Sequence, residues 1–119
     1  MLLDTNILIE VFKGNKEIFD ALQKENDLCI SSITSMELYF GALNKPETTK
    51  IQKALRAFRV VHLNQEISIK AIELVETYSK SHGLMIPDAI IAATAIIEST
   101  SLKTLNKKDF RFIKELNIC

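Results

Sequence analysis

The chain begins Met1-Leu2-Leu3-Asp4-Thr5-Asn6-Ile7-Leu8-Ile9, and this stretch already sets the pattern of the fold. Its first three residues are apolar, which suits a very short buried strand, and Asp4 ends that run. Residues 6–12 then place apolar side chains at helical spacing, and Lys13-Gly14-Asn15 ends the helix. A buried strand that leads directly into a helix is the repeating unit of an α/β fold.

The same alternation of short apolar runs and helical patterns continues along the chain, without internal repeats or a change of composition. It predicts one domain over residues 1–119, of α/β class, with a central and mostly parallel sheet of four or five strands flanked by about seven helices. Gly83 fits the cap of one helix. The strands are expected at 1–3, 28–30, 60–63, 102–105 and, at the edge of the sheet, 116–119. The helices are expected at 6–12, 16–25, 35–43, 46–58, 66–81, 87–100 and 108–113.

Composition and charge exclude several classes of protein. The hydrophobic share of 47% and the charged share of 25% are typical of a folded globule and not of a disordered chain. Lys and Arg balance Asp and Glu at 15 each, so net charge indicates no particular partner. There is no signal peptide pattern, and the longest weakly charged stretch, 84–97, is too short to cross a bilayer. We therefore expect a cytoplasmic protein without membrane association, with Cys29 and Cys119 as reduced thiols.

Four acidic residues stand where a buried element would otherwise be apolar. Asp4 ends the first expected strand, Asp109 follows the fourth, and Glu37 and Asp88 lie near the starts of helices. Each position also has an ordinary explanation. Asp is a favoured helix cap, and an acid in a first turn gains from the helix dipole. Glu37, three residues after Thr34, also fits a capping box.

Taken together, the four acids point to a metal site. In an open parallel sheet, ligands collect at the carboxyl ends of the strands, which is where Asp4 and Asp109 are expected. Two carboxylates about 4 Å apart repel by about 4 kcal/mol at an effective dielectric constant of 20. Four such groups require protonation or a divalent cation. Ligand sets made only of oxygen favour Mg²⁺ or Mn²⁺, which can activate water for phosphodiester cleavage.

The stretches that carry these acids resemble the PIN domain family, and more narrowly the VapC-type toxins of prokaryotic toxin–antitoxin pairs. The resemblance runs from the first residue to about Phe110, in the family's order and at its usual spacings. The matching stretches are Leu3-Asp4-Thr5-Asn6-Ile7-Leu8-Ile9, Ser32-Ile33-Thr34-Ser35-Met36-Glu37-Leu38 with Gly41, Ile86-Pro87-Asp88-Ala89-Ile90-Ile91-Ala92-Ala93-Thr94-Ala95, and Thr104-Leu105-Asn106-Lys107-Lys108-Asp109-Phe110.

The resemblance implies an endoribonuclease that depends on Mg²⁺ or Mn²⁺ and hydrolyses RNA phosphodiester bonds with metal-activated water. It implies that this nuclease is the toxin of a type II toxin–antitoxin system, forms a homodimer and is blocked by a small antitoxin protein. The acids that match the family's catalytic and metal-binding positions are Asp4, Glu37, Asp88 and Asp109. The polar residues that match or accompany supporting positions are Thr5, Asn6, Thr104 and Asn106.

Basic side chains are needed to hold RNA against so many acids. Lys50, Lys53 and Arg56 recur at three-residue spacing on one expected helix. A second group near Asp109 includes Lys107, Lys108 and Arg111. Both groups are candidates for RNA binding, and both could equally be solvated surfaces.

Other functions remain open at the level of sequence. Phosphoryl-transfer domains of the haloacid-dehalogenase or receiver type also place an Asp after their first strand. The former requires a second Asp two residues later, where this chain has Asn6. A PIN-fold nuclease that acts on other nucleic acid outside a toxin–antitoxin pair is an alternative, and so is a catalytically silent binding module of the same fold.

Overall fold

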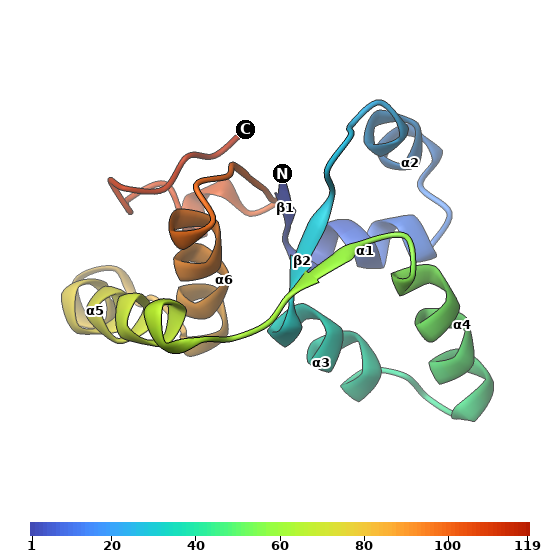
Figure 1. Ribbon diagram of the computed structural model, residues 1–119, viewed down its shortest axis with the longest axis horizontal. Coiled ribbons are helices and arrows are strands. Elements are labelled where there is room, and N and C mark those ends of the chain that lie inside the picture. The colour runs from blue at the N-terminus through green and yellow to red at the C-terminus, as the bar shows by residue number, and fades with distance from the viewer.

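The computed structural model describes residues 1–119 and has a four-stranded parallel sheet between two layers of helices. In Figure 1, α5, α6 and the C-terminal segment lie on one side of the sheet, and α1 to α4 lie on the other. The strands are β1 (Leu2–Leu3), β2 (Cys29–Ser31), β3 (Arg59–Val61) and β4 (Leu102–Lys103). The helices are α1 (Thr5–Phe12), α2 (Lys16–Gln23), α3 (Ser32–Phe40), α4 (Lys45–Leu55), α5 (Gln65–His82), α6 (Ile86–Ile97) and the 3₁₀ helix η1 (Lys107–Asp109).

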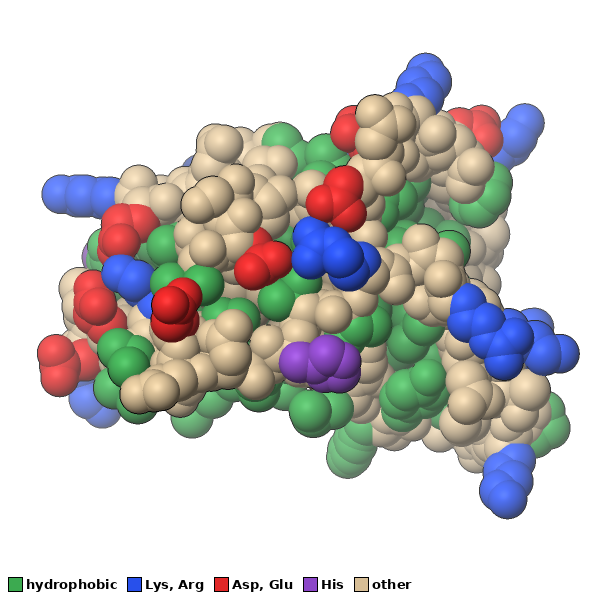
Figure 2. All heavy atoms as spheres, viewed as in Figure 1, with side chains coloured by type: hydrophobic (Ala, Val, Ile, Leu, Met, Phe, Trp, Pro, Cys, Tyr) green, Lys and Arg blue, Asp and Glu red, His purple; other side chains and the backbone are tan.

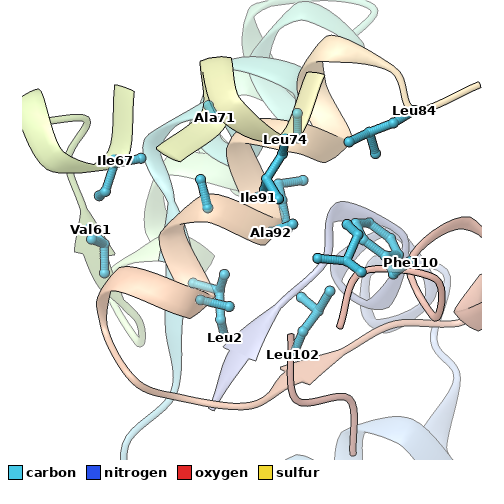
Figure 3. Packing of buried hydrophobic residues seen from close by; sticks show 14 of the residues in the cluster. Leu2, Val61, Ile67, Ala71, Leu74, Leu84, Ile91, Ala92, Leu102 and Phe110 are labelled. Atoms are coloured by element: carbon cyan, nitrogen blue, oxygen red, sulfur yellow. The ribbon is translucent and has the colours of Figure 1, made fainter. Parts of the chain in front are cut away.

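Alternation along the strands explains why the sheet is covered on both faces. Successive residues of a strand point to opposite sides, so Leu2 of β1 packs with α5 and α6 while Leu3 packs with α1 and α4. On β2, Cys29 lies in the same core as Leu2, and Ile30 lies in the same core as Leu3. Figure 3 shows the larger of the two cores, where Leu2 lies among side chains from β4, α5 and α6. The predicted fold class is confirmed.

The order of the strands is β3-β2-β1-β4. All strands are parallel, but the order in which the chain adds them to the sheet reverses at β1. The chain first adds β2 and β3 on one side of β1 and then crosses over to place β4 on the other side. In open parallel sheets, ligands bind beyond the carboxyl ends of the strands at such a reversal. Asp4 directly follows β1 and Thr104 directly follows β4, so both stand at this point of the sheet.

The third helix begins earlier than predicted. It was expected at 35–43 with Thr34 as its cap, but α3 starts at Ser32, because the side chain of Ser31 caps it by accepting a hydrogen bond from the Ile33 amide. Thr34 is therefore buried inside the helix, and the predicted capping box with Glu37 is wrong. The strand expected at 60–63 ends at Val61 for a related reason, since its partner strand β2 ends at Ser31.

The segment after β4 also differs from the prediction. A helix was expected at 108–113, but the chain forms only η1 and then a series of tight turns. The apolar spacing did identify two buried residues, Phe110 and Ile113. The backbone here, however, forms mostly hydrogen bonds between residues three apart, as in 3₁₀ turns, and not a continuous α-helix. The edge strand expected at 116–119 is reduced to one parallel bridge between Ile118 and Leu102.

Several other boundaries move by a few residues. The helices expected at 16–25, 46–58 and 87–100 end two or three residues early, at Gln23, Leu55 and Ile97. The strand expected at 102–105 ends at Lys103, opposite the last residue of β1. None of the helices combines the length and apolar character that a bilayer span requires.

Candidate active site

Asp4 is the most buried of the four acids, with 6% of its surface exposed. It caps α1, and its Oδ1 accepts a hydrogen bond of 2.8 Å from the Thr5 amide. Its Oδ2 accepts a hydrogen bond of 2.7 Å from the hydroxyl of Thr104. Burial raises the pKa of Asp4, the two hydrogen bonds oppose this, and the charges of Glu37 and Asp109 add to the rise.

Two hydrogen bonds of Asn6 fix the position of the residues after β4 relative to α1. The side chain of Asn6 accepts a bond of 3.3 Å from the Leu105 amide and donates one of 3.4 Å to the Thr104 hydroxyl. The Asn106 amide also donates to that hydroxyl, at 3.0 Å. With one proton given to Asp4 and two bonds accepted, the Thr104 hydroxyl has used its full hydrogen-bonding capacity. Of the four predicted supporting residues, Asn106 contributes only through its backbone.

Glu37 joins the site from α3 through Thr5. The Thr5 hydroxyl donates a hydrogen bond of 2.7 Å to Oε1 of Glu37 and lies 3.0 Å from the hydroxyl of Thr34. Glu37 therefore faces the start of α1 instead of the start of its own helix, which a capping box would have required. Thr34 is a residue of the site that the prediction missed, because it was assigned to the helix cap.

Asp88 lies in the first turn of α6, whose cap residue Met85 makes no side-chain bond. The Asp88 carboxylate is half-buried and accepts no hydrogen bond from the protein. Its pKa is raised to about 6, mainly by burial and further by the negative charges of Asp4, Asp109 and Glu37. The charges of acids from three other segments therefore act on Asp88.

Asp109 is the last residue of η1 and the most loosely held member of the group. Its side chain is exposed and, like that of Asp88, accepts no hydrogen bond from the protein. It reaches the other acids because β4 lies beside β1, which places the turn after β4 at the end of β1. Its charge acts on both Asp4 and Asp88.

No positive side chain neutralises this group. All the ion pairs of the protein lie elsewhere. They include two networks of three residues, Arg59 with Asp27 and Glu98 and Lys70 with Glu73 and Glu115. As the side chains stand, no three acids, histidines or cysteines lie close enough together to hold a metal ion. The site is thus a gathering of carboxylates with uncompensated charge. Such a group can attract a divalent cation, since its donors are all hard oxygens.

The two predicted basic groups lie in different places. Lys50, Lys53 and Arg56 are exposed, and Figure 2 shows blue side chains spread over α4 at the right of the view. Lys50 and Lys53 line a hollow between α1 and α4 that contains none of the four acids. The other group is exposed around η1, on the same short segment as Asp109, and consists of Lys107, Lys108 and Arg111.

Comparison with known proteins gives a consistent result. The sequence pattern of the PIN domain matches residues 1–115. Ribonuclease VapC1 of Methanocaldococcus jannaschii is 32% identical over 120 residues, which cover 99% of this chain and 84% of that protein. Ribonuclease VapC10 of Mycobacterium tuberculosis is 30% identical, with coverage of 98% and 90%.

Solved structures agree with these relatives. A toxin–antitoxin complex from Klebsiella pneumoniae contains a chain that superposes with a TM-score of 0.83 at 37% identity, covering 97% of this chain and 93% of that one. VapBC-1 from nontypeable Haemophilus influenzae gives a TM-score of 0.86 at 27% identity, with coverage of 99% and 95%.

Proposed function

Since this chain belongs to the PIN domain family, we propose that it is a metal-dependent endoribonuclease and the toxin of a type II toxin–antitoxin pair. The relatives named as VapC ribonucleases cover nearly the whole chain and support this activity. The observation that carries the proposal is that the charges of Glu37 and Asp109 act on both Asp88 and Asp4, and that Asp4 stands at the reversal of strand order.

The residues present suit Mg²⁺ or Mn²⁺. The acids offer only carboxylate oxygens, which these hard cations prefer, and no Lys or Arg pairs with them. Asp4, Glu37 and Asp88 are the proposed ligands, and Asp109 helps to hold a second ion or to orient water. When bound, the metal supplies charge neutralisation and lowers the pKa of an attacking water.

The protein's own side chains prepare the site for this chemistry. Thr104 and the Thr5 amide each hold one oxygen of Asp4, so this carboxylate is fixed before any ligand arrives. Thr5 fixes Glu37 in the same way. Asp88 and Asp109 have no protein donors, so their oxygens are free to hold a cation or a water molecule. No histidine is required as a base.

RNA must approach this negative site across a basic surface. Lys107, Lys108 and Arg111 are the stronger candidates for phosphate contacts, because they flank Asp109. The α4 group is the weaker candidate, since the hollow that Lys50 and Lys53 line holds no acid of the site.

The proposed partner is a small antitoxin. Structures of two relatives are described as toxin–antitoxin and VapBC complexes, which supports a partner of this kind. On this chain, a hollow of about 660 Å³ between α1, α2 and α4 offers exposed aromatic side chains, including Phe12 and Phe19, to an apolar segment. Co-purification with the product of a small adjacent reading frame tests the pairing. The proposed place of action is the cytoplasm, where free thiols such as Cys119 stay reduced.

The proposal also includes a homodimer. A groove of about 520 Å³ between α5 and α6 is lined almost entirely by apolar residues. Ile72 and Ile86 each expose 65% of their surface there. An exposed apolar groove of this kind is typical of an interface between protein chains.

The decisive experiment measures cleavage of a single-stranded RNA by the purified chain with Mg²⁺, with Mn²⁺ and with EDTA. Asp4→Asn and Asp88→Asn should each lower the rate by at least about a thousandfold while the fold is retained, because each removes a proposed metal ligand. Asp20→Asn, an exposed acid on α2, is the matched control and should cleave like the wild type.

Four results would contradict the proposal, each at a different point. Cleavage by Asp88→Asn at the wild-type rate would remove Asp88 from the site. Equal cleavage with EDTA would remove the metal. Cleavage of DNA but not RNA would favour a nuclease outside a toxin–antitoxin pair, and no cleavage at all by the metal-loaded wild type would favour a silent binding module.

A further inference from the structure

Thr34 is a buried hydroxyl with an unusual bonding pattern. None of its surface is exposed. A Thr inside a helix commonly gives its proton to the carbonyl four residues earlier, as Thr94 does to Ile90 at 2.7 Å. Thr34 has no such acceptor, because it lies in the first turn of α3 and the residue four positions earlier belongs to β2. The only hydrogen-bonding partner of its buried hydroxyl is the hydroxyl of Thr5.

Counting protons gives the direction of this contact. Thr5 has a single hydroxyl proton and lies 2.7 Å from Oε1 of Glu37 and 3.0 Å from Oγ1 of Thr34. The ionised carboxylate can only accept, so the Thr5 proton points to Glu37. The hydroxyl–hydroxyl bond must then use the proton of Thr34. Thr34 therefore donates to Thr5, and Thr5 donates to Glu37.

We infer that Thr34 is a positioning residue of this site: it aims the Thr5 hydroxyl, and through it fixes the carboxylate of Glu37. The inference rests on the proposed function, since it gives the fixed carboxylate a purpose. Glu37 is exposed, and its carboxylate accepts no hydrogen bond other than that from Thr5, so this series of hydroxyls is its only hydrogen-bonded support. A rigid support beneath a ligand preserves metal affinity by keeping the ligand in place.

The experiment compares Thr34→Val with two matched variants. Thr34→Ser keeps the hydroxyl. Thr94→Val removes an equally buried hydroxyl that bonds only within α6. The first readout is the side-chain order parameter of Glu37 in the metal-free protein, measured by ¹³C relaxation. The second is the affinity for Mn²⁺, measured by calorimetry on the intact chain.

In Thr34→Val, the Glu37 side chain should become as mobile as that of Glu17, an exposed residue of α2. Affinity for Mn²⁺ should weaken about threefold to tenfold, which corresponds to the loss of one hydrogen bond. Thr34→Ser should behave like the wild type in both measurements, and Thr94→Val should leave both unchanged. Should Thr34→Val fail to fold, Thr34→Cys, which keeps a weaker donor, replaces it and should give an intermediate loss.

The inference is overturned if folded Thr34→Val keeps wild-type Glu37 order, or if Thr94→Val weakens Mn²⁺ binding to the same extent. A wild-type chain that neither binds Mn²⁺ nor cleaves RNA would refute the proposed function instead. The order of Glu37 in the metal-free protein would still decide the role of Thr34 in that case, so the two failures are distinguishable.

Discussion

The four acids fall into two pairs, which differ in whether their carboxylates accept hydrogen bonds from the protein. Asp4 and Glu37 accept hydrogen bonds from fixed donors, which hold their carboxylates in place. Asp88 and Asp109 accept none. Asp88 is also half-buried among the other charges, so its ionised form is strained and its pKa rises to about 6. An ion would relieve this strain, and so would a neutral side chain.

The raised pKa of Asp88 predicts a pH-dependent loss of stability. The unfolded chain releases this proton near pH 4, whereas the folded chain keeps it until about pH 6. The folded state thus binds more protons between these values, and stability falls as the pH rises through this window. Asp88→Asn removes the effect and should raise the free energy of unfolding at pH 7 by up to about 3 kcal/mol.

Urea unfolding of both proteins in EDTA, at pH 4 and at pH 7, measures this effect. The advantage of Asp88→Asn over the wild type should be small at pH 4 and largest at pH 7. Added Mn²⁺ at pH 7 should stabilise only the wild type. An advantage that does not change with pH would show that the Asp88 carboxylate is not under electrostatic strain.

At the scale of elements, the site depends on where helices begin and end. Asp4 serves both as the cap of α1 and as a member of the site. Ser31 caps α3 early enough to bury Thr34 within its first turn and direct Glu37 towards α1. α5 must end sharply so that the chain can turn into α6 and deliver Asp88. Gly83 provides that ending in the left-handed conformation, with φ of 69°.

Substitution of this glycine tests the importance of the turn. Gly83→Ala should lower the free energy of unfolding by about 1 kcal/mol, because a side chain disfavours the left-handed conformation. Gly41, which ends α3, is the matched control. Its φ of −79° suits any residue, and an added Cβ would lie in ordinary contact, 3.5 Å from the Glu37 carbonyl.

Gly41→Ala should therefore cause no loss of stability, and it can even stabilise slightly by restricting the unfolded chain. Both variants are measured by urea unfolding. Equal losses in the two would mean that backbone conformation at Gly83 is not the cause.

At the scale of the whole molecule, the two helical layers offer apolar surfaces on opposite sides of the sheet. The groove between α5 and α6 lies on one side, and the hollow between α1, α2 and α4 lies on the other. Because the sheet separates them, both can be covered at once. The proposed second copy and the proposed antitoxin would therefore bind different surfaces.

The proposed dimer is tested by changing a side chain that is already exposed. Ile72→Glu places a charge in the groove of α5 and α6 and should convert the dimer to a monomer without loss of fold, because burying an unpaired carboxylate is costly. Ile9→Glu, at a 41% exposed position on α1, is the control and should remain dimeric.

Analytical ultracentrifugation at micromolar concentration distinguishes these outcomes. A monomeric wild-type chain would contradict the dimer. A dimeric Ile72→Glu would place the interface elsewhere.

Local features of the sequence determined the order of the elements. Short apolar runs marked the strands, helical spacing marked the long helices, and Gly83 marked the end of α5, since each signal acts between near neighbours in the chain. The sequence also singled out the four acids, because a charged residue after a buried strand or near the start of a buried helix is conspicuous. Local signals failed where two of them competed, as at Ser31 and Thr34, which are both good caps.

Only the tertiary structure decided how these residues meet. Pairing of β4 with β1 brings Thr104 to Asp4 across 100 positions of the chain, and no local pattern encodes that contact. The same holds for the bond from Thr5 to Glu37 and for the raised pKa of Asp88. These properties depend on distances between segments that are remote in sequence. Those distances are set only when the strands pair and the helices pack on both faces of the sheet.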